Sequence, residues 1–438
     1  MSLLETDREL TRNSYYAATA KREVSYPALQ GDVRADVAIV GGGLAGLSAA
    51  IELADRGCTV ALLEANEVGS GASGRNGGQA IHGLACEQSV IEDQLGLDAA
   101  KRVWSMTIEA LDLIRERCAR FAIDCDWRDG WLGLAVNTHK GRALREWAQR
   151  IERVYAYPLT LIDPADIGRW IDSPRYHSGI HDPRSGHLHP LKYSLGLARA
   201  ARSLGVRVYE RSAVMRLEHG PVVTLRTSAG VVHADQVLLA SNVYLDGIAP
   251  RIENRIMPVG TYIIASEPLG AERARSLIPS GAAVCDTNFV LEYFRPTVDH
   301  RMLFGGRVSY TTRTPANLAA SMHQRMSTAF PQLRDTKVDY AWGGFVDISM
   351  SRAPDFGRLA PQGASARPPN VYYLQGFSGH GLALTGLAGK LVAEAIAGDA
   401  SRFDTFARLK NRPFPGGRLL RTPALVLGTA WYRLRDML

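Results

Sequence analysis

The chain has 438 residues, of which 46% are hydrophobic and 22% are charged. This length and balance exclude a disordered chain and favour about two to three folded domains. The net charge of +7 comes from Lys and Arg that are spread along the chain rather than clustered. No nucleic-acid-binding motif accompanies them, so we expect no nucleic-acid partner.

The N-terminal sequence MSLLETDREL is polar, and the first apolar run begins only at Val37. We therefore expect neither a signal peptide nor a transmembrane segment. The apolar tail Ala424–Leu438 is too short to span a bilayer and could dock on the protein, on a second subunit or on a membrane surface. A homo-oligomer is therefore possible.

The cysteines are scattered, odd in number and without CxxC spacing. This usage favours free thiols in a reducing compartment, and we expect a cytoplasmic protein. The five positions are Cys58, Cys86, Cys118, Cys125 and Cys285.

The stretch Asp36–Ala65 reads DVAIVGGGLAGLSAAIELADRGCTVALLEA. Its pattern predicts a buried strand over Val37–Val40, a helix over about Leu44–Arg56 and a second strand over Thr59–Leu63. A glycine-rich turn joins the first strand to the helix. This arrangement is typical of a dinucleotide-binding βαβ unit.

Each glycine of this turn has a separate expected role. Gly41 makes the tight turn, Gly43 lets the backbone approach a pyrophosphate, and Gly46 lets helix and strand pack closely. The helix N-terminus then offers free amides and the positive end of its dipole to the phosphates. Glu64 follows the second strand, where an acidic side chain accepts hydrogen bonds from a ribose diol.

Two further glycine-rich segments indicate which dinucleotide is bound. The loop Gly69–Gln79 (GSGASGRNGGQ) directly follows the acid-tipped strand and can wrap a cofactor that stays bound. Later, a predicted strand at Val371–Leu374, a turn at Gly376–Gly381 and a helix to about Ala397 form a second strand-turn-helix unit. A second helix N-terminus suits a flavin, because reduction places negative charge on its N1 and C2 carbonyl.

Together these segments resemble the FAD-dependent amine and D-amino-acid oxidase superfamily, and within it the gamma-glutamylputrescine oxidoreductases. The similarity covers nearly the whole chain. Besides the glycine motifs, it is carried by SYYAATA (Ser14–Ala20), IDCDWR (Ile123–Arg128), SGHLHPL (Ser185–Leu191), RSLIP (Arg275–Pro279), SRAPDFGRL (Ser351–Leu359), RFDTFA (Arg402–Ala407) and FPGGRLLRTP (Phe414–Pro423).

The resemblance implies an FAD cofactor. The first position of covalent attachment in the family lacks a His here, and Ser349 and Met350 stand where a linking Cys would be, so we expect noncovalent FAD. The resemblance also places the backbone of Val214 beside the adenine. The expected FAD-binding residues are Gly41, Gly43, Leu44, Ala45, Gly46, Glu64, Ala65, Ser73, Gly74, Arg75, Asn76, Gly77, Gly78, Val214, Ala240, Gly376, Ser378, Gly379, His380 and Gly381.

We expect an α/β (α+β) fold with a Rossmann-like FAD-binding domain and a second, mixed or antiparallel-sheet substrate domain, both discontinuous in sequence. Alternating strand patterns dominate Arg251–Phe330 and would form a roof over the flavin. The expected ranges are 30–92, 158–246 and 336–408 for the FAD-binding domain, 93–157 and 247–335 for the substrate domain, and 409–438 for the tail.

Amine oxidation on a flavin needs no catalytic triad, because the cofactor carries the chemistry. The sequence offers no triad, and we expect no metal, since the His177–His189 histidines lack a matching ligand set. His380 is a weak candidate base. Arg295 and Arg307 are candidate partners for a substrate carboxylate, and Tyr262 and Tyr293 are candidate channel walls.

These features predict oxidation of a primary amine to an aldehyde, with release of ammonia and hydrogen peroxide by molecular oxygen, and the expected amine is gamma-glutamylputrescine. One alternative is a D-amino-acid or N-methyl-amino-acid dehydrogenase that passes electrons to a quinone. An alternative of another class is a noncatalytic flavin-binding partner of a redox protein.

Overall fold

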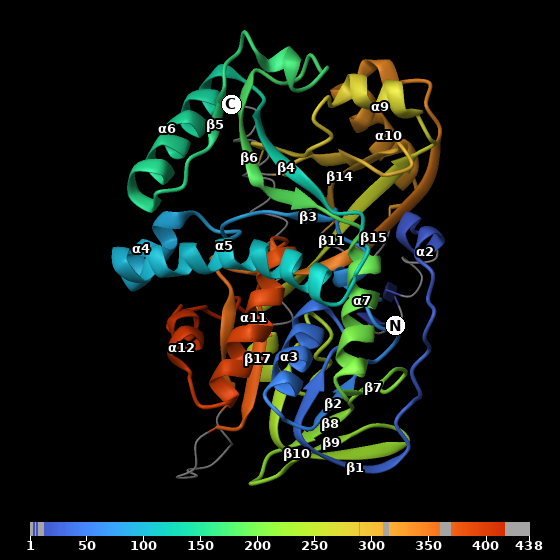
Figure 1. The fold of residues 1–438 in the computed structure, drawn as a ribbon, viewed down its shortest axis with the longest axis vertical. Coiled ribbons are helices and arrows are strands. Elements are labelled where there is room, and N and C mark those ends of the chain that lie inside the picture. The colour runs from blue at the N-terminus through green and yellow to red at the C-terminus, as the bar shows by residue number, and fades with distance from the viewer. Residues whose placement is uncertain are drawn as a thin grey trace.

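The computed structural model describes residues 3–4, 6–7, 13–288, 290–309, 315–359 and 369–416, and only the backbone of 307–309. Within these ranges the chain forms an eight-stranded sheet and a nine-stranded sheet, which occupy the lower and upper parts of the molecule in Figure 1. The expected mixed α/β fold with two sheets is confirmed. The apolar tail 424–438 lies outside the described residues.

The first sheet has the strand order β16-β17-β10-β1-β2-β7, with β9 on β10 and β8 on β9. Its central strands pair in parallel, and β8, β9 and β16 pair antiparallel. The strands are β1 (Gly31–Val40), β2 (Val60–Leu63), β7 (Arg207–Tyr209), β8 (Arg216–Glu218), β9 (Val223–Arg226), β10 (Gly230–Leu239), β16 (Asp355–Leu359) and β17 (Val371–Gln375).

Strand β1 begins at Gly31, well before the predicted start at Val37. It pairs in register with β10 from Gly31 opposite Gly230 to Val40 opposite Leu239. The apolar run marks only the half of the strand that is buried in the core, because parallel strands become continuously apolar where helices cover the sheet. The polar first half was therefore missed.

Long helices cover the first sheet, and α3, α7 and α11 lie together in front of its strands in Figure 1. Helices α3 and α11 approach so closely that a Cβ on Gly389 would lie 2.6 Å from the amide nitrogen of Ala49. The helices on this side are α3 (Leu44–Asp55), α4 (Gln88–Leu95), α5 (Leu97–Arg120), α7 (Pro190–Ser203), α11 (Gly381–Ile396) and α12 (Ser401–Ala407).

The second sheet has the order β15-β11-β14-β13-β12-β4-β6-β3, with β5 on β6. All its pairs are antiparallel except β4 with β12. The strands are β3 (Gln79–Ala80), β4 (Arg128–Ala135), β5 (Thr160–Ile162), β6 (Ser178–His187), β11 (Ile256–Ser266), β12 (Ala283–Asp286), β13 (Tyr293–Pro296), β14 (Met302–Ser309) and β15 (Val338–Ser349).

The remaining helices and the 3₁₀ turns complete the fold. Helix α10 packs on β11, β14 and β15, and α6 packs on β4 and β6. They are α2 (Tyr15–Thr19), α6 (Thr138–Tyr155), α8 (Pro250–Glu253), α9 (Ala271–Leu277) and α10 (Leu318–Ala329), with single 3₁₀ turns η1 (Ala72–Gly74), η2 (Ile167–Arg169) and η3 (Pro331–Leu333).

Both sheets draw strands from separate parts of the chain. Strands β3, β5, β6 and β15 fall within ranges expected for the FAD-binding domain, yet they pair in the second sheet. Strand pairing alone does not fix a domain boundary, so the domain ranges stay a prediction. Among the described residues no single helix is long and apolar enough to cross a membrane, although the sharply bent pair α11 and α12 meets that length and composition test together.

Candidate functional site

The first glycine turn joins β1 to α3. Gly41 has a φ of +115°, and a Cβ there would lie 2.4 Å from the carbonyl oxygen of Ala240. A Cβ on Gly46 would lie 2.0 Å from the carbonyl oxygen of Gly41. Both obstacles are backbone atoms, so neither position accepts a side chain. Residues 43–45 line a cavity, and the N-terminus of α3 therefore opens toward it, as a phosphate site requires.

Gly43 is constrained by a different neighbour. A Cβ on Gly43 would lie 2.7 Å from the hydroxyl oxygen of Ser73. That hydroxyl oxygen accepts a hydrogen bond of 2.9 Å from the amide of Leu44. Ser73 belongs to residues 69–79, which we call the cofactor loop, so this loop returns to the start of α3 and closes one side of the cavity.

Glu64 lies against the same turn. One of its carboxylate oxygens accepts a hydrogen bond from the Gly42 amide at 2.7 Å, and the other accepts one from the Asn66 amide at 2.8 Å. Burial raises the pKa of Glu64, and these two hydrogen bonds act in the opposite direction. Glu64 is not among the described residues that line the cavity, so its contact with a ribose stays a prediction.

Arg75 fastens the cofactor loop to other parts of the chain. Its side chain is 3% exposed and forms an ion pair with Asp7, which lies near the N-terminus. It also donates to the carbonyl oxygen of Gly343 in β15, at 3.3 Å. The indole nitrogen of Trp342 donates to the carbonyl oxygen of Arg75 at 2.9 Å. Although Arg75 lines the cavity, its charge is already paired.

Asn76 folds the cofactor loop upon itself. Its side-chain nitrogen donates to the carbonyl oxygens of Ala72 and Ser73, at 2.9 and 3.1 Å. Its side-chain oxygen accepts from the amide of Gly78 at 2.8 Å. These bonds use both N–H groups and the oxygen of the side-chain amide, and they connect residues 72, 73 and 78 of the loop.

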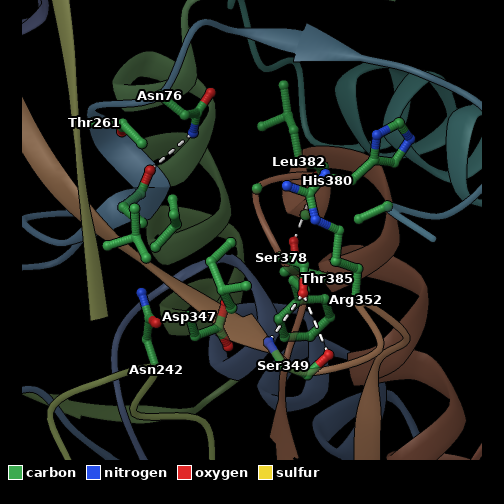
Figure 2. Close-up of a pocket in the computed structure, with 18 of the residues that line it drawn as sticks. Asn76, Asn242, Thr261, Asp347, Ser349, Arg352, Ser378, His380, Leu382 and Thr385 are labelled. Carbon is green, nitrogen blue, oxygen red and sulfur yellow. Dashed lines mark hydrogen bonds between the residues drawn. The ribbon is translucent and has the colours of Figure 1, made fainter. Parts of the chain in front are cut away.

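The second glycine turn joins β17 to α11 and is tied to β15. The amide of Gly376 donates to a carboxylate oxygen of Asp347 at 2.6 Å. The amide of Ser378 donates to the carbonyl oxygen of Asp347 at 3.0 Å, and the hydroxyl of Ser378 accepts from the amide of Ser349 at 3.2 Å. Figure 2 shows Ser349, Ser378 and Asp347 together on one wall of the cavity.

Asp347 is an unusual residue for this wall. Its side chain lines the cavity, yet the residue is only 4% exposed. No Lys or Arg within the described ranges forms an ion pair with it. Burial raises its pKa to about 7, against the backbone hydrogen bonds of the second turn, which lower it. Asp347 can therefore gain or lose a proton near neutral pH.

The cavity has a volume of about 840 Å³ and lies between the two sheets. Both glycine turns and the cofactor loop form one side, and β11, β13 and β15 contribute to the other. Two helix N-termini facing one elongated space fit a dinucleotide with a flavin ring, because the pyrophosphate and the reduced ring both carry negative charge. The residues present therefore fit FAD.

The cavity brings together most of the residues predicted to bind FAD. Those that line it are Gly43, Leu44, Ala45, Ser73, Arg75, Asn76, Gly77, Ala240, Ser378, Gly379, His380 and Gly381. The remaining predicted residues do not line it, and their contacts with FAD stay predictions. They are Gly41, Gly46, Glu64, Ala65, Gly74, Gly78, Val214 and Gly376.

Arg295 is not a substrate-facing residue, which corrects the expectation from the sequence. It is 4% exposed and does not line the cavity. Its guanidinium donates to the carbonyl oxygens of Gly77 at 2.7 Å and Leu188 at 2.9 Å, and to the hydroxyl of Tyr16 at 3.1 Å. Arg295 therefore braces the cofactor loop against the crossover to α7 and against α2.

The other three substrate candidates differ among themselves. Tyr262 is 1% exposed, packs in the core of the second sheet and does not line the cavity, so it is not a channel wall. Tyr293 does line the cavity, and its ring fills the space over Gly77 and Gly305. The backbone of Arg307 lies in β14, but its side chain lies outside the described part of the structure.

His380 lines the cavity at the start of α11. Its Nε2 atom lies 2.9 Å from the carbonyl oxygen of His82. Since a carbonyl only accepts, Nε2 carries the proton, and it is not the basic atom of the ring. Burial lowers the pKa of His380, which favours the neutral ring. His380 thus holds the second turn against residues 81–82, and a role in catalysis stays a prediction.

Two thiols line the cavity, Cys86 and Cys285. Burial raises the pKa of each to about 12, which keeps them protonated and weakly nucleophilic. The thiol of Cys285 also donates to the side-chain oxygen of Gln79 at 2.8 Å. These facts agree with noncovalent FAD, which stays a prediction. No group of His, Cys, Asp and Glu among the described residues could hold a metal ion.

Sequence reasoning missed several cavity residues, notably Asp347 and Arg352. Figure 2 shows the Arg352 side chain extending along the cavity beside Ser378 and Leu382. Arg352 has a φ of +60° and belongs to a turn in which its amide donates to the carbonyl oxygen of Ser349 at 3.2 Å. Charged residues at the end of an apolar strand were the available signal, but only the fold shows that this strand ends at the cofactor.

Comparison with known proteins supports these observations. The family described as FAD dependent oxidoreductase matches residues 36–395. The gamma-glutamylputrescine oxidoreductase of Escherichia coli K12 is 44% identical over 97% of this chain and 98% of its own. The probable oxidoreductase OrdL of Haemophilus influenzae is 40% identical over 97% of each chain.

Solved structures show the same fold at low sequence identity. Glycine oxidase from Geobacillus kaustophilus has a TM-score of 0.68 at 21% identity and covers 83% of this chain and 95% of its own. L-proline dehydrogenase from P. horikoshii has a TM-score of 0.68 at 19% identity, over 84% of this chain and 94% of its own. The chain therefore belongs to the FAD-dependent oxidoreductase (DAO) family and is an FAD-dependent oxidoreductase.

Proposed function

We propose that the protein oxidises the terminal primary amine of gamma-glutamylputrescine. One amine, one oxygen and one water molecule give one aldehyde, one ammonia and one hydrogen peroxide. The observation that carries this proposal is the 44% identity, over nearly the full length of both chains, to the gamma-glutamylputrescine oxidoreductase of Escherichia coli K12. Bound FAD supplies the chemistry by accepting a hydride equivalent from the carbon that carries the amine.

The second glycine turn supports this chemistry. Ser378, Gly379 and Gly381 line the cavity where α11 begins. The backbone amides of Gly379 and Gly381 and the positive end of the helix dipole favour negative charge in front of them, whereas the Ser378 amide is already bonded to Asp347. We expect these groups to stabilise the electron-rich end of the reduced ring, and residues 43–45 to hold the pyrophosphate.

Asp347 supplies a group that can hold the proton of the substrate. A primary amine resembles the Lys side chain, with a pKa of about 10.4, so it arrives as an ammonium, whereas oxidation requires the neutral amine. Asp347 and Glu87 are the carboxyl residues among the described cavity lining, and of these only Asp347 is buried. A buried carboxylate attracts the ammonium and can take its proton.

Arg352 supplies a cation for the other end of the substrate. The gamma-glutamyl group carries a carboxylate, which a guanidinium can bind through two parallel hydrogen bonds. The Arg residues among the described cavity lining are Arg75 and Arg352. We expect Arg352 to make this contact, because its side chain extends along the cavity beside Ser378 and Leu382 in Figure 2.

A peroxide assay with a panel of amines tests the proposed function. We expect gamma-glutamylputrescine under air to bleach the oxidised flavin and to release one peroxide for each aldehyde formed. Bleaching by the same amine without peroxide, but with reduction of an added quinone, would replace the oxidase by a dehydrogenase. Bleaching only by D-amino acids or N-methyl-amino acids would contradict the proposed substrate.

A further inference from the structure

Two of the five thiols lie next to each other, away from the cavity. Cys118 belongs to the last turn of α5, Cys125 follows in the segment before β4, and their Sγ atoms are 3.5 Å apart. The backbone between them turns tightly, because the amide of Ile123 donates to the carbonyl oxygen of Cys118 at 2.9 Å and Ala122 has a φ of +49°. Local chain geometry therefore holds the two thiols together.

The two thiols have different surroundings. Cys118 is half-buried, whereas Cys125 is 2% exposed and packs in the core of the first sheet. The hydrogen bond between them lowers the pKa of Cys118 and raises the pKa of Cys125. A half-buried thiol with a lowered pKa, next to a second thiol that can resolve its oxidised form, is the arrangement found in redox-responsive cysteines.

We propose that Cys118 and Cys125 are a reversible oxidation site that closes to a disulfide when the protein meets hydrogen peroxide. The Cys118 thiolate attacks one peroxide oxygen, so that an S–O bond forms, the O–O bond breaks, and the departing hydroxide is protonated to water. Oxidation removes the Cys118 thiolate, which is the largest cause of the raised pKa of Cys125, and Cys125 then attacks the Cys118 sulfur, so that an S–S bond forms and the S–O bond breaks. The second hydroxide takes the Cys125 proton. Two electrons pass from the thiol pair to peroxide, and two water molecules are released.

The site is connected to the cofactor loop through α7. The carbonyl oxygen of Cys125 accepts from the amide of His189, the N-cap of α7, at 2.7 Å. Helix α7 packs on the cofactor loop, where a Cβ on Gly74 would lie 2.9 Å from Leu191. Closing the disulfide brings the two Sγ atoms from 3.5 Å to about 2.05 Å and so fixes the segment that supports this helix. The inference depends on the proposed function only for the enzyme's own supply of peroxide.

The test uses resting holoenzyme, reagent hydrogen peroxide and no amine. We expect the number of titratable thiols to fall from five to three and to return to five after reduction with dithiothreitol. Trypsin separates Cys118, in the peptide Cys118–Arg120, from Cys125, in Phe121–Arg128. After oxidation these two peptides should be recovered as one linked species that lacks two hydrogen atoms, which requires no substituted protein.

Single substitutions assign the order of the steps. Cys118→Ser should abolish the loss of thiols, while Cys125→Ser should leave a sulfenic acid on Cys118 that a 1,3-diketone reagent traps. Cys86→Ser and Cys285→Ser, in the cavity, should leave the linked peptide unchanged. Five remaining thiols, a different linked pair, or sulfinic acid on Cys118 without a link would overturn the proposal. An enzyme that makes no peroxide from amines would leave these results unaffected and would contradict the proposed function alone.

Discussion

The two sides of the cavity differ in how their residues are specified. On the side of the first sheet, Gly41, Gly43 and Gly46 belong to one short segment at the start of α3. Because they are close in sequence, their spacing along the chain determines their positions in space. On the side of the second sheet, Arg295 and Tyr262 come from different strands, and neither lines the cavity. Local chain geometry determines the first side, whereas strand pairing and the choice of sheet face determine the second.

Among the substitutions considered for FAD binding, glycine substitution at the first turn should reduce FAD affinity the most. Gly46→Ala places a Cβ 2.0 Å from the carbonyl oxygen of Gly41. Alanine is the better helix former by roughly 0.5–1 kcal/mol, so any loss must come from the clash. We expect about a hundredfold loss of FAD affinity, because the clash is with backbone and so lies near the upper end of the roughly 1–3 kcal/mol that overpacking commonly costs. Equilibrium titration of the apoprotein with FAD measures this affinity.

A matched control separates this effect from a general response to alanine. A Cβ on Gly168 would meet no described atom within 4 Å, and Gly168→Ala should keep the affinity of the unsubstituted protein. Equal affinity in both variants would show that α3 and the first turn do not hold the pyrophosphate.

Arg295→Met tests whether Arg295 stabilises the cofactor loop or selects the substrate. It leaves the carbonyl oxygens of Gly77 and Leu188 without their donor in a buried environment. We expect the free energy of unfolding to fall by roughly 2–6 kcal/mol, about 1–3 kcal/mol for each unsatisfied carbonyl, as measured by urea denaturation. The ratio of activities toward gamma-glutamylputrescine and putrescine should stay the same. A changed ratio at unchanged stability would restore Arg295 as a substrate residue.

The raised pKa of Asp347 predicts that the free energy of unfolding depends on pH. Its pKa is raised to about 7 in the folded state, so the folded protein binds more protons than the unfolded chain between about pH 4 and 7. Its stability contribution is therefore present at acidic pH and is lost as pH rises toward about 7. From pH 5 to 7 the loss should be roughly 2–3 kcal/mol. Asp347→Asn should flatten this profile in thermal or urea unfolding, and an unchanged profile would exclude Asp347 as its origin.

Glu64→Ala should reduce FAD affinity less than Gly46→Ala does. Charge-assisted hydrogen bonds to a ribose diol are worth roughly 2 kcal/mol, or about a thirtyfold loss of FAD affinity. The same titration with FAD checks this value. FMN lacks the adenosine part, so its weaker binding should be insensitive to the substitution, and an equal loss for both flavins would place Glu64 in a structural role at the Gly42 amide.

The sequence predicted the fold class, the FAD cofactor and most of the cofactor side of the site, because those signals are local. Twelve of the twenty predicted FAD residues line the cavity. The substrate side was not predictable in the same way. Asp347 lies near the end of β15, and Arg352 lies just after it. The neighbouring strand β11 is about eighty residues earlier in the chain. Nothing in the strand itself shows that its end meets the second glycine turn.

The most direct test of the account is the specificity for gamma-glutamylputrescine over putrescine, measured as the ratio of kcat/KM values for peroxide formation. Arg352 is half-buried, and a hydrogen bond to a charged group is worth about 1.5–3 kcal/mol, so the ratio should be roughly tenfold to 150-fold. Arg352→Gln should bring it close to one mainly by reducing activity toward gamma-glutamylputrescine. Equal kcat/KM values for the two amines in the unsubstituted enzyme would contradict the proposed recognition of the substrate.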